Sequence, residues 1–68
     1  MRTYVIRVSS PNKAPTRFAV LAPSSGQAMA AMVADLGLSD IAEITGEVLN
    51  SNVAARLGLT PGRPLRLV

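Results

Sequence analysis

The chain can close only one hydrophobic core, because it has 68 residues and a second core would have too few side chains to exclude water. A single core in a domain of this size rarely supplies more than ~3–5 kcal/mol of stability. Small domains gain further support from disulfides, a bound metal or association. Since the chain has no cysteine and no histidine, we expect no metal and no cofactor. We expect a homo-oligomer or a protein partner to supply the support instead.

Four segments have the alternation of apolar and polar residues, or the β-branched content, that is typical of β-strands. They are residues 4–9, 17–22, 41–49 and 65–68. Within the third segment, Gly46 interrupts the alternation and indicates a β-bulge. Just before the last segment, Pro64 withholds a backbone donor, which predicts that this strand either lies at the edge of the sheet or starts one residue later.

A helix is predicted between the second and third of these segments. Ser24 and Gln27 have the spacing of a capping box, which marks the first turn of a helix. Gly37 is expected to end the helix in the left-handed conformation, with Leu38 in the apolar contact of a Schellman cap. Apolar residues recur at i, i+3, i+4 and i+7, which places them in one stripe against the sheet: Met29, Met32, Val33 and Leu36.

A shorter helical turn is predicted over residues 53–57, because Asn50 can cap its start and Gly58 can end it. The proline and glycine at positions 61 and 62 have the order typical of a type II turn. Residues 1–68 are therefore expected to form a single α+β domain with the order β-β-α-β-(short α)-β. A right-handed crossover gives a small antiparallel or mixed sheet in the order 2-1-3, with the first strand central and one helix packed on it.

The sequence has no combination of residues that is typical of an active site, and we expect no enzymatic activity. Without cysteine or histidine, the chain lacks the usual zinc and iron ligands and the base that activates a serine nucleophile. Glu43 and Glu47 lie about 13 Å apart along one strand, too far to share a proton. We expect these two carboxylates to be solvated or to pair across the sheet with Arg7 and Arg17.

The chain has no apolar run that is typical of export or of membrane insertion. Polar residues interrupt its first twelve positions, so we expect no signal peptide. No run approaches the roughly 18 apolar residues of a membrane span. With no cysteine to indicate an oxidising compartment, a cytoplasmic protein is expected.

Basic segments flank an acidic middle. Residues 1–17 carry four basic side chains, residues 18–55 four acidic ones, and residues 56–68 three arginines. The net charge of +3 and the preference for arginine favour one alternative function, a regulator that binds nucleic acid through its phosphates. Against it, Tyr4 and Phe18 are the only aromatic residues and both lie on the expected core face, so no stacking platform is predicted.

Two surfaces are candidates for association with a protein. The second face of the sheet carries apolar residues among charged ones, and either the last segment of the chain or a partner could cover it; its candidates are Val5, Ala19 and Leu21. The helix side opposite the apolar stripe has few long side chains and could approach another backbone closely; its candidates are Ala30, Ala31 and Ala34. Alanine is also simply the best helix former. The leading prediction is a small non-enzymatic interaction module that associates with itself or with another protein.

The last third of the chain, residues 46–68, has an order of motifs that occurs in a known family. A short helix is followed by Leu-Gly-Leu, a Pro-Gly turn and an edge strand. This order resembles the second half of the swapped-hairpin domain of AbrB-type transition-state regulators. The segment departs from that family at Arg63, where an acidic residue usually stands, and at Pro64, which interrupts the strand.

The resemblance to AbrB-type domains implies an intertwined dimer that binds DNA through basic residues. Arg56 lies in the matching short helix, and it would contact phosphates together with Arg7 and Arg17. The first half of the chain, residues 4–37, is similar to a strand-hairpin-helix pattern that is common in small phage and mobile-element proteins. That similarity implies no particular activity.

Overall fold

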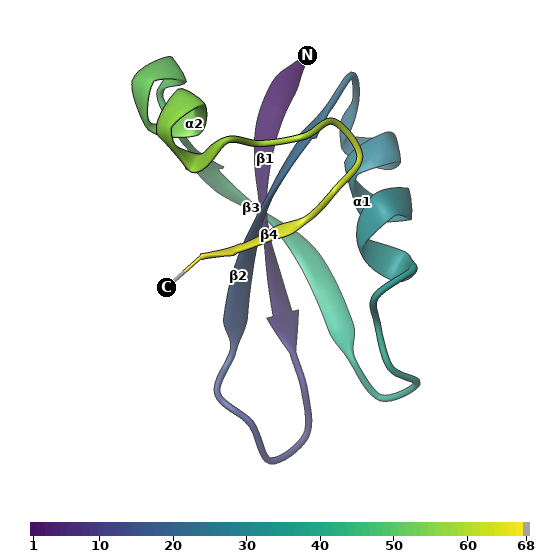
Figure 1. Ribbon diagram of the computed structural model, residues 1–68. Coiled ribbons are helices and arrows are strands. Elements are labelled where there is room, and N and C mark those ends of the chain that lie inside the picture. The colour runs from purple at the N-terminus through teal and green to yellow at the C-terminus, as the bar shows by residue number, and fades with distance from the viewer. Residues whose placement is uncertain (68) are drawn as a thin grey trace.

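The fold is an antiparallel sheet of four strands with one helix packed on it, as described for residues 1–67 by a computed structural model (Figure 1). The elements in chain order are β1 (Arg2–Ser9), β2 (Thr16–Ala22), α1 (Ser25–Val33), β3 (Ile41–Val48), α2 (Ser51–Leu57) and β4 (Leu65–Leu67). The predicted α+β class and order of elements are confirmed.

The strands lie in the order β3-β1-β2-β4, so the predicted central place of the first strand is confirmed. β1 and β2 form an antiparallel hairpin in which Val5 lies opposite Ala19. β4 pairs with the outer edge of β2, where Leu65 lies opposite Ala19. The last strand therefore pairs with a strand of its own chain and forms an edge of the sheet, as Pro64 predicts. The last predicted strand residue, Val68, lies outside the described residues.

The pairing of β1 with β3 contains the bulge that Gly46 indicates. Ile6 lies opposite Ile44, but Tyr4 lies opposite Val48. Three residues of β3, with Gly46 in the middle, therefore face the one β1 residue between these pairs. Such an insertion bends the strand and increases its local twist.

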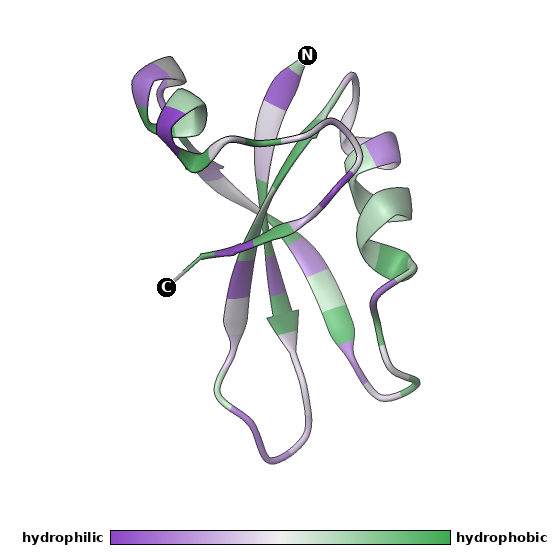
Figure 2. Ribbon diagram, viewed as in Figure 1, coloured by the Kyte–Doolittle hydropathy of each residue, from purple (hydrophilic) through white to green (hydrophobic). Residues whose placement is uncertain are grey.

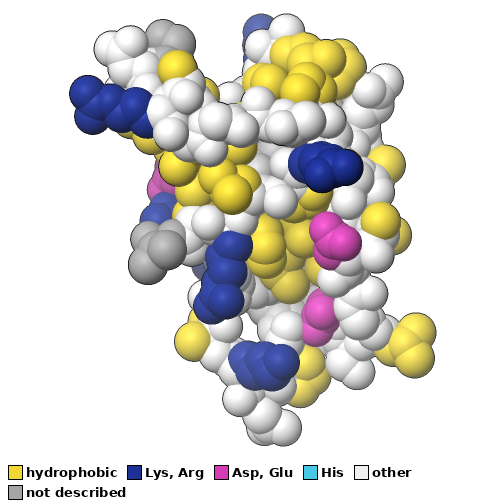
Figure 3. Space-filling model, in the orientation of Figure 1, with side chains coloured by type: hydrophobic (Ala, Val, Ile, Leu, Met, Phe, Trp, Pro, Cys, Tyr) yellow, Lys and Arg dark blue, Asp and Glu magenta, His cyan; other side chains and the backbone are white. Residues whose placement is uncertain are grey.

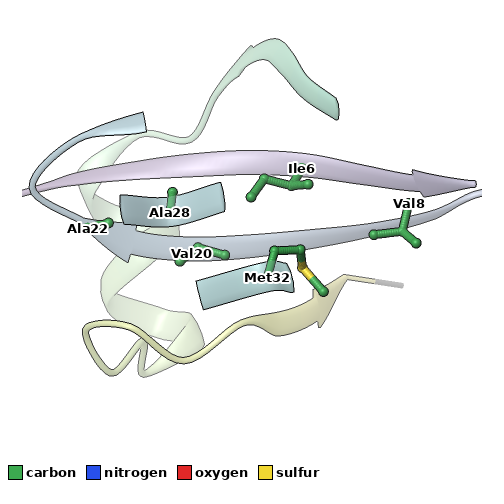
Figure 4. Close-up of a cluster of buried hydrophobic side chains, with 6 residues drawn as sticks. All are labelled: Ile6, Val8, Val20, Ala22, Ala28 and Met32. Atoms are coloured by element: carbon green, nitrogen blue, oxygen red, sulfur yellow. The ribbon is translucent and has the colours of Figure 1, made fainter. Parts of the chain in front are cut away.

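The core lies between α1 and the face of the sheet that carries Ile6, which we call the helix face. Successive side chains of a strand point to opposite faces, so β1 and β2 each send every second residue into this core. Figure 4 shows the buried side chains converging from β1, β2 and α1, and they are Ile6, Val8, Val20, Ala22, Ala28 and Met32. Tyr4, Phe18 and Ala42 are partly buried around them.

The predicted start of α1 is confirmed, and its predicted end is wrong. The Ser24 side chain caps the helix by accepting a hydrogen bond from the Gln27 backbone N–H (3.2 Å). The helix ends at Val33, before the predicted end at Gly37. The Asp35 and Leu36 N–H groups bond to the carbonyl oxygens three residues earlier, which tightens and closes the last turn.

The predicted apolar stripe is also rotated from its expected position. Met32 is buried, but Met29 and Leu36 are only partly buried and Val33 is 60% exposed. Ala28 occupies the buried position instead. Ala28 and Met32 are four residues apart and therefore lie on one side of the helix. That side faces the sheet, so Val33, the residue after Met32, points away from it.

The predicted caps and turn in the last third of the chain are confirmed. Asn50 caps α2 by accepting from the Val53 N–H (2.9 Å), and Gly58 ends it in the left-handed region, at φ 64°. Gly62 has φ 76° in a turn that the Arg63 N–H closes on the Thr60 carbonyl (3.1 Å). Glycine adopts such angles without a Cβ clash. Within residues 1–67, no helix is long and apolar enough to cross a membrane.

Candidate functional site

The face of the sheet away from α1, which we call the open face, carries two ion pairs. Arg7 of β1 lies opposite Glu43 of β3, and the two side chains are paired. Arg17 of β2 pairs with Glu47 of β3, with its Nη1 at 2.6 and 2.8 Å from the two carboxylate oxygens. All four side chains are between two fifths and about half exposed. The expected pairing of the two carboxylates across the sheet is confirmed.

The Arg17–Glu47 pair spans the central strand. Since β1 lies between β2 and β3, the Arg17 side chain has to cross above β1 to reach its partner. The carboxylate belongs to one of the three bulge residues that face Val5. Val5 and its neighbour Ala19 are completely buried. The prediction that these two residues contact a partner is therefore wrong, because the chain's own side chains cover them; Leu21 is partly buried.

The three arginines predicted to contact phosphates do not form one site. Arg7 and Arg17 lie opposite each other in the first hairpin, but each is held by a glutamate with which a phosphate would compete. Arg56 is exposed on α2, which lies near the other end of β1 (Figure 1). The structure thus brings two of the three together and separates the third.

The alanine side of α1, predicted to contact a partner, is only partly exposed to solvent. Ala30 and Ala34 are exposed, whereas Ala31 is partly buried and packs against the core. Figure 2 shows that the helix stays hydrophobic toward its C-terminal end. The exposed alanines therefore border a larger apolar surface at the end of the helix.

That larger surface, which we call the association corner, consists of Val33, Leu38 and Ile41. Val33 is 60% exposed, Ile41 is 69% exposed, and Leu38 is fully exposed. The three residues lie at the end of α1, in the connection that follows, and at the start of β3. An apolar patch on the surface is typical of a site that binds another protein, and these three exposed side chains belong to one short stretch of the chain, residues 33–41.

Leu38 is held at the tip of a tight turn. The Asp40 N–H donates to the Gly37 carbonyl (3.2 Å), and the Gly37 N–H donates to one Asp40 carboxylate oxygen (2.8 Å). The other oxygen accepts from the Ser10 hydroxyl (2.6 Å), which belongs to the first hairpin. These contacts replace the Schellman cap predicted at Gly37 and Leu38, so that prediction is wrong. The hydrogen bonds of Asp40 hold this turn in a conformation that leaves the Leu38 side chain exposed to water.

The same hydrogen bonds predict how acid affects the turn. The Ser10 hydroxyl, then the Gly37 N–H and the positive charge of Lys13 hold the pKa of Asp40 below its usual value. A carboxyl with a lowered pKa stabilises the fold above its unfolded pKa of about 4, and this contribution disappears as the pH falls through the folded value. We therefore expect wild type to be more stable than Asp40→Asn at neutral pH. The difference should begin to shrink near the unfolded pKa of about 4 and disappear only once the pH is below the lower pKa of the folded state.

Urea denaturation of both proteins over a pH series measures that difference. Asp35→Asn is the matched control, because Asp35 lies in the same connection and makes no side-chain hydrogen bond within residues 1–67. This variant should keep the pH profile of wild type. A difference between wild type and Asp40→Asn that stays constant down to strongly acidic pH would contradict the role given to the Asp40 carboxylate.

A hollow of about 240 Å³, which we call the end pocket, lies beside this turn at the open end of the core. Its lining mixes apolar residues, Val8, Phe18, Met32 and Leu36, with polar and charged ones, Ser10, Lys13, Thr16, Asp35, Asp40 and Arg66. The acidic residues come from the α1–β3 connection, and the basic ones from the first hairpin and β4. Figure 3 shows a hydrophobic hollow between acidic side chains on one side and basic side chains on the other.

The chain matches no protein-family model, and it has no match among curated proteins or among solved structures. The resemblance of residues 46–68 to AbrB-type domains therefore stays a prediction. Within the described residues, no group of three or more acidic, cysteine or histidine side chains could hold a metal ion. The features that distinguish this chain are its association corner, its end pocket and its ion-paired open face.

Proposed function

We propose that this protein is a small, non-enzymatic association module of the cytoplasm. Its partner is a second copy of the same protein, which it binds through the association corner. The observation that carries the proposal is the exposure of Val33, Leu38 and Ile41 along one short connection. Burying one such side chain stabilises a complex by about 1.5–3 kcal/mol. A domain with a single small core gains most from this kind of support.

The alanines of α1 support the same surface. Ala30 is exposed on α1, and Ala34 is exposed directly after Val33, the last residue of that helix. Side chains this small let a second backbone come close without losing much side-chain entropy. A partner that covers the association corner can therefore extend onto the helix.

Sedimentation equilibrium over a wide concentration range tests the proposal. Wild type should form a discrete oligomer whose dissociation constant changes little with salt, because an apolar contact is not screened. The variant with Val33→Ser, Leu38→Ser and Ile41→Thr should stay monomeric. The matched control is Val53→Ser, which removes a partly exposed valine from α2 and should associate as wild type does.

A wild-type protein that stays monomeric at every concentration would contradict this function, and so would a triple variant that associates normally. Circular dichroism of each variant shows whether it is folded. Because the three replaced residues are mostly exposed, loss of the fold is not expected.

Nucleic-acid binding is the alternative function, and one observation favours it. Lys13, Arg56, Arg63 and Arg66 make no ion pair within residues 1–67, and Figure 3 shows basic side chains spread over this side of the molecule. Adding a mixed DNA and RNA pool to the same sedimentation runs tests it. Binding that weakens steeply as salt rises would support phosphate contacts, and Arg56→Ala should then reduce the salt dependence.

A further inference from the structure

We propose that two copies of this chain associate about a two-fold axis, with Leu38 of each copy inserted into the end pocket of the other. The inference rests on the proposed function, because it names the partner and the contact through which the association corner acts. It joins two features that lie next to each other: an exposed apolar side chain and a hollow lined in part by apolar residues.

Leu38 has the properties of an anchor residue. It is fully exposed, and the turn that presents it is closed between Gly37 and Asp40 and tied to Ser10. Turn tips usually carry glycine, asparagine, aspartate or serine, so a leucine here leaves a large apolar side chain in water. Because the turn is already ordered, binding through it loses little conformational entropy.

The end pocket has the properties of a receptor for that side chain. Phe18, Met32 and Leu36 contribute to its apolar lining, and its volume of about 240 Å³ leaves room for a branched aliphatic side chain. Phe18 and Leu36 are only partly buried in the monomer. A leucine placed there would cover apolar surface that now faces water, which is the main source of affinity at protein interfaces.

The charges around the two features are complementary. Leu38 lies between Asp35 and Asp40 in the chain, so an incoming copy brings an acidic loop with an apolar tip. One rim of the end pocket carries Lys13 and Arg66, and the other carries Asp35 and Asp40. An incoming acidic loop is attracted to the basic rim and repelled by the acidic one, which favours the orientation that places it against Lys13 and Arg66.

The position of the pocket allows both contacts to form at once. Asp35, Leu36 and Asp40 line the pocket and flank the Leu38 turn, so anchor and receptor belong to one patch of the surface. In a two-fold interface the same patch contacts itself, and each contact occurs twice. The pair is therefore closed and leaves no end for further copies.

Leu38→Ser tests the anchor. We expect the dissociation constant of the dimer to rise at least ~100-fold, because each dimer loses two buried leucine side chains. The matched control is Leu38→Met, which keeps a long apolar side chain and should leave the dissociation constant within about tenfold of wild type. Sedimentation equilibrium measures all three proteins.

Mixing two defective variants tests the two-fold arrangement. The pocket variant Lys13→Glu with Arg66→Glu keeps Leu38 but repels the acidic loop, so it should not associate alone. An equimolar mixture with Leu38→Ser restores one of the two contacts, because the pocket of the Leu38→Ser copy is intact and the other copy supplies its leucine. We expect the mixture to associate at least ~10-fold more tightly than either variant alone.

The outcomes separate this inference from the proposed function. If wild type is monomeric at every concentration, both are wrong. If wild type associates and Leu38→Ser leaves the dissociation constant unchanged, the insertion of Leu38 is wrong. If Leu38→Ser associates normally but the triple variant at the association corner is monomeric, the insertion of Leu38 is wrong and the proposed function, association through Val33 or Ile41, is supported. A mixture that associates no better than its components overturns the two-fold pairing.

Discussion

Replacing Ile6 by alanine is expected to lower the free energy of unfolding by about 2–5 kcal/mol. Ile6 is completely buried in the central strand, where it lies opposite Phe18 on one side and Ile44 on the other. Its removal leaves a cavity that neighbouring strands cannot fill without breaking the sheet register. Since a core of this size supplies only ~3–5 kcal/mol, much of the protein should be unfolded.

Urea denaturation at one fixed protein concentration measures this loss, since association also stabilises the folded state. Ile6→Val is the matched control and should cost only about 0.5–1.5 kcal/mol, because it removes a single methyl group. Equal losses for the two variants would show that the site relaxes around the cavity, which would contradict a closely packed core at this position.

Replacing Met32 by alanine is expected to cost a similar amount, about 2–5 kcal/mol, for a different reason. Met32 is 1% exposed and is the only large side chain of α1 that is fully buried against the sheet. The other fully buried residue of the helix is Ala28, which has almost no side chain to pack. Removing Met32 should therefore loosen the whole helix from the sheet.

Met32→Leu keeps the volume and should cost less than about 1.5 kcal/mol. Hydrogen exchange distinguishes the two core variants, because amides of α1 should lose protection in Met32→Ala before those of β1. Loss of protection in both elements together would mean that helix and sheet unfold as one unit. Met32 also lines the end pocket, so Met32→Ala should weaken self-association even where the protein stays folded.

Most of the fold could be predicted from local patterns. A period of two identifies the strands, and it also places Arg7 and Arg17 on the same face as Glu43 and Glu47. The pattern therefore makes ion pairs one of two expected arrangements, and the structure shows that they form. The end of α1 could not be predicted, because two local structures compete at Gly37: a Schellman cap and a turn closed by Asp40. A hydrogen bond from Ser10, thirty residues away, helps to hold Asp40 in the turn.

The error at Gly37 also hid the candidate site. A helix that continues to Gly37 makes Leu38 a capping contact, whereas a helix that ends at Val33 leaves it at an exposed turn. Likewise, the alternation along β1 and β2 places Val5 and Ala19 on the open face, but it does not show that both are completely buried in the folded chain. Both errors concern contacts between distant parts of the chain, which sequence periodicity does not describe.

The bulge in β3 also affects how this protein behaves at high concentration. β3 has a strand on one side only among the described residues, and an outer edge of this kind can template the addition of further strands, as in fibrils. The three residues that face Val5 bend that edge and break its regular spacing, so an incoming strand finds only a short stretch to pair with. The other edge of the sheet is β4, which has only three residues, so neither edge offers an incoming strand a long, regular stretch of free backbone groups.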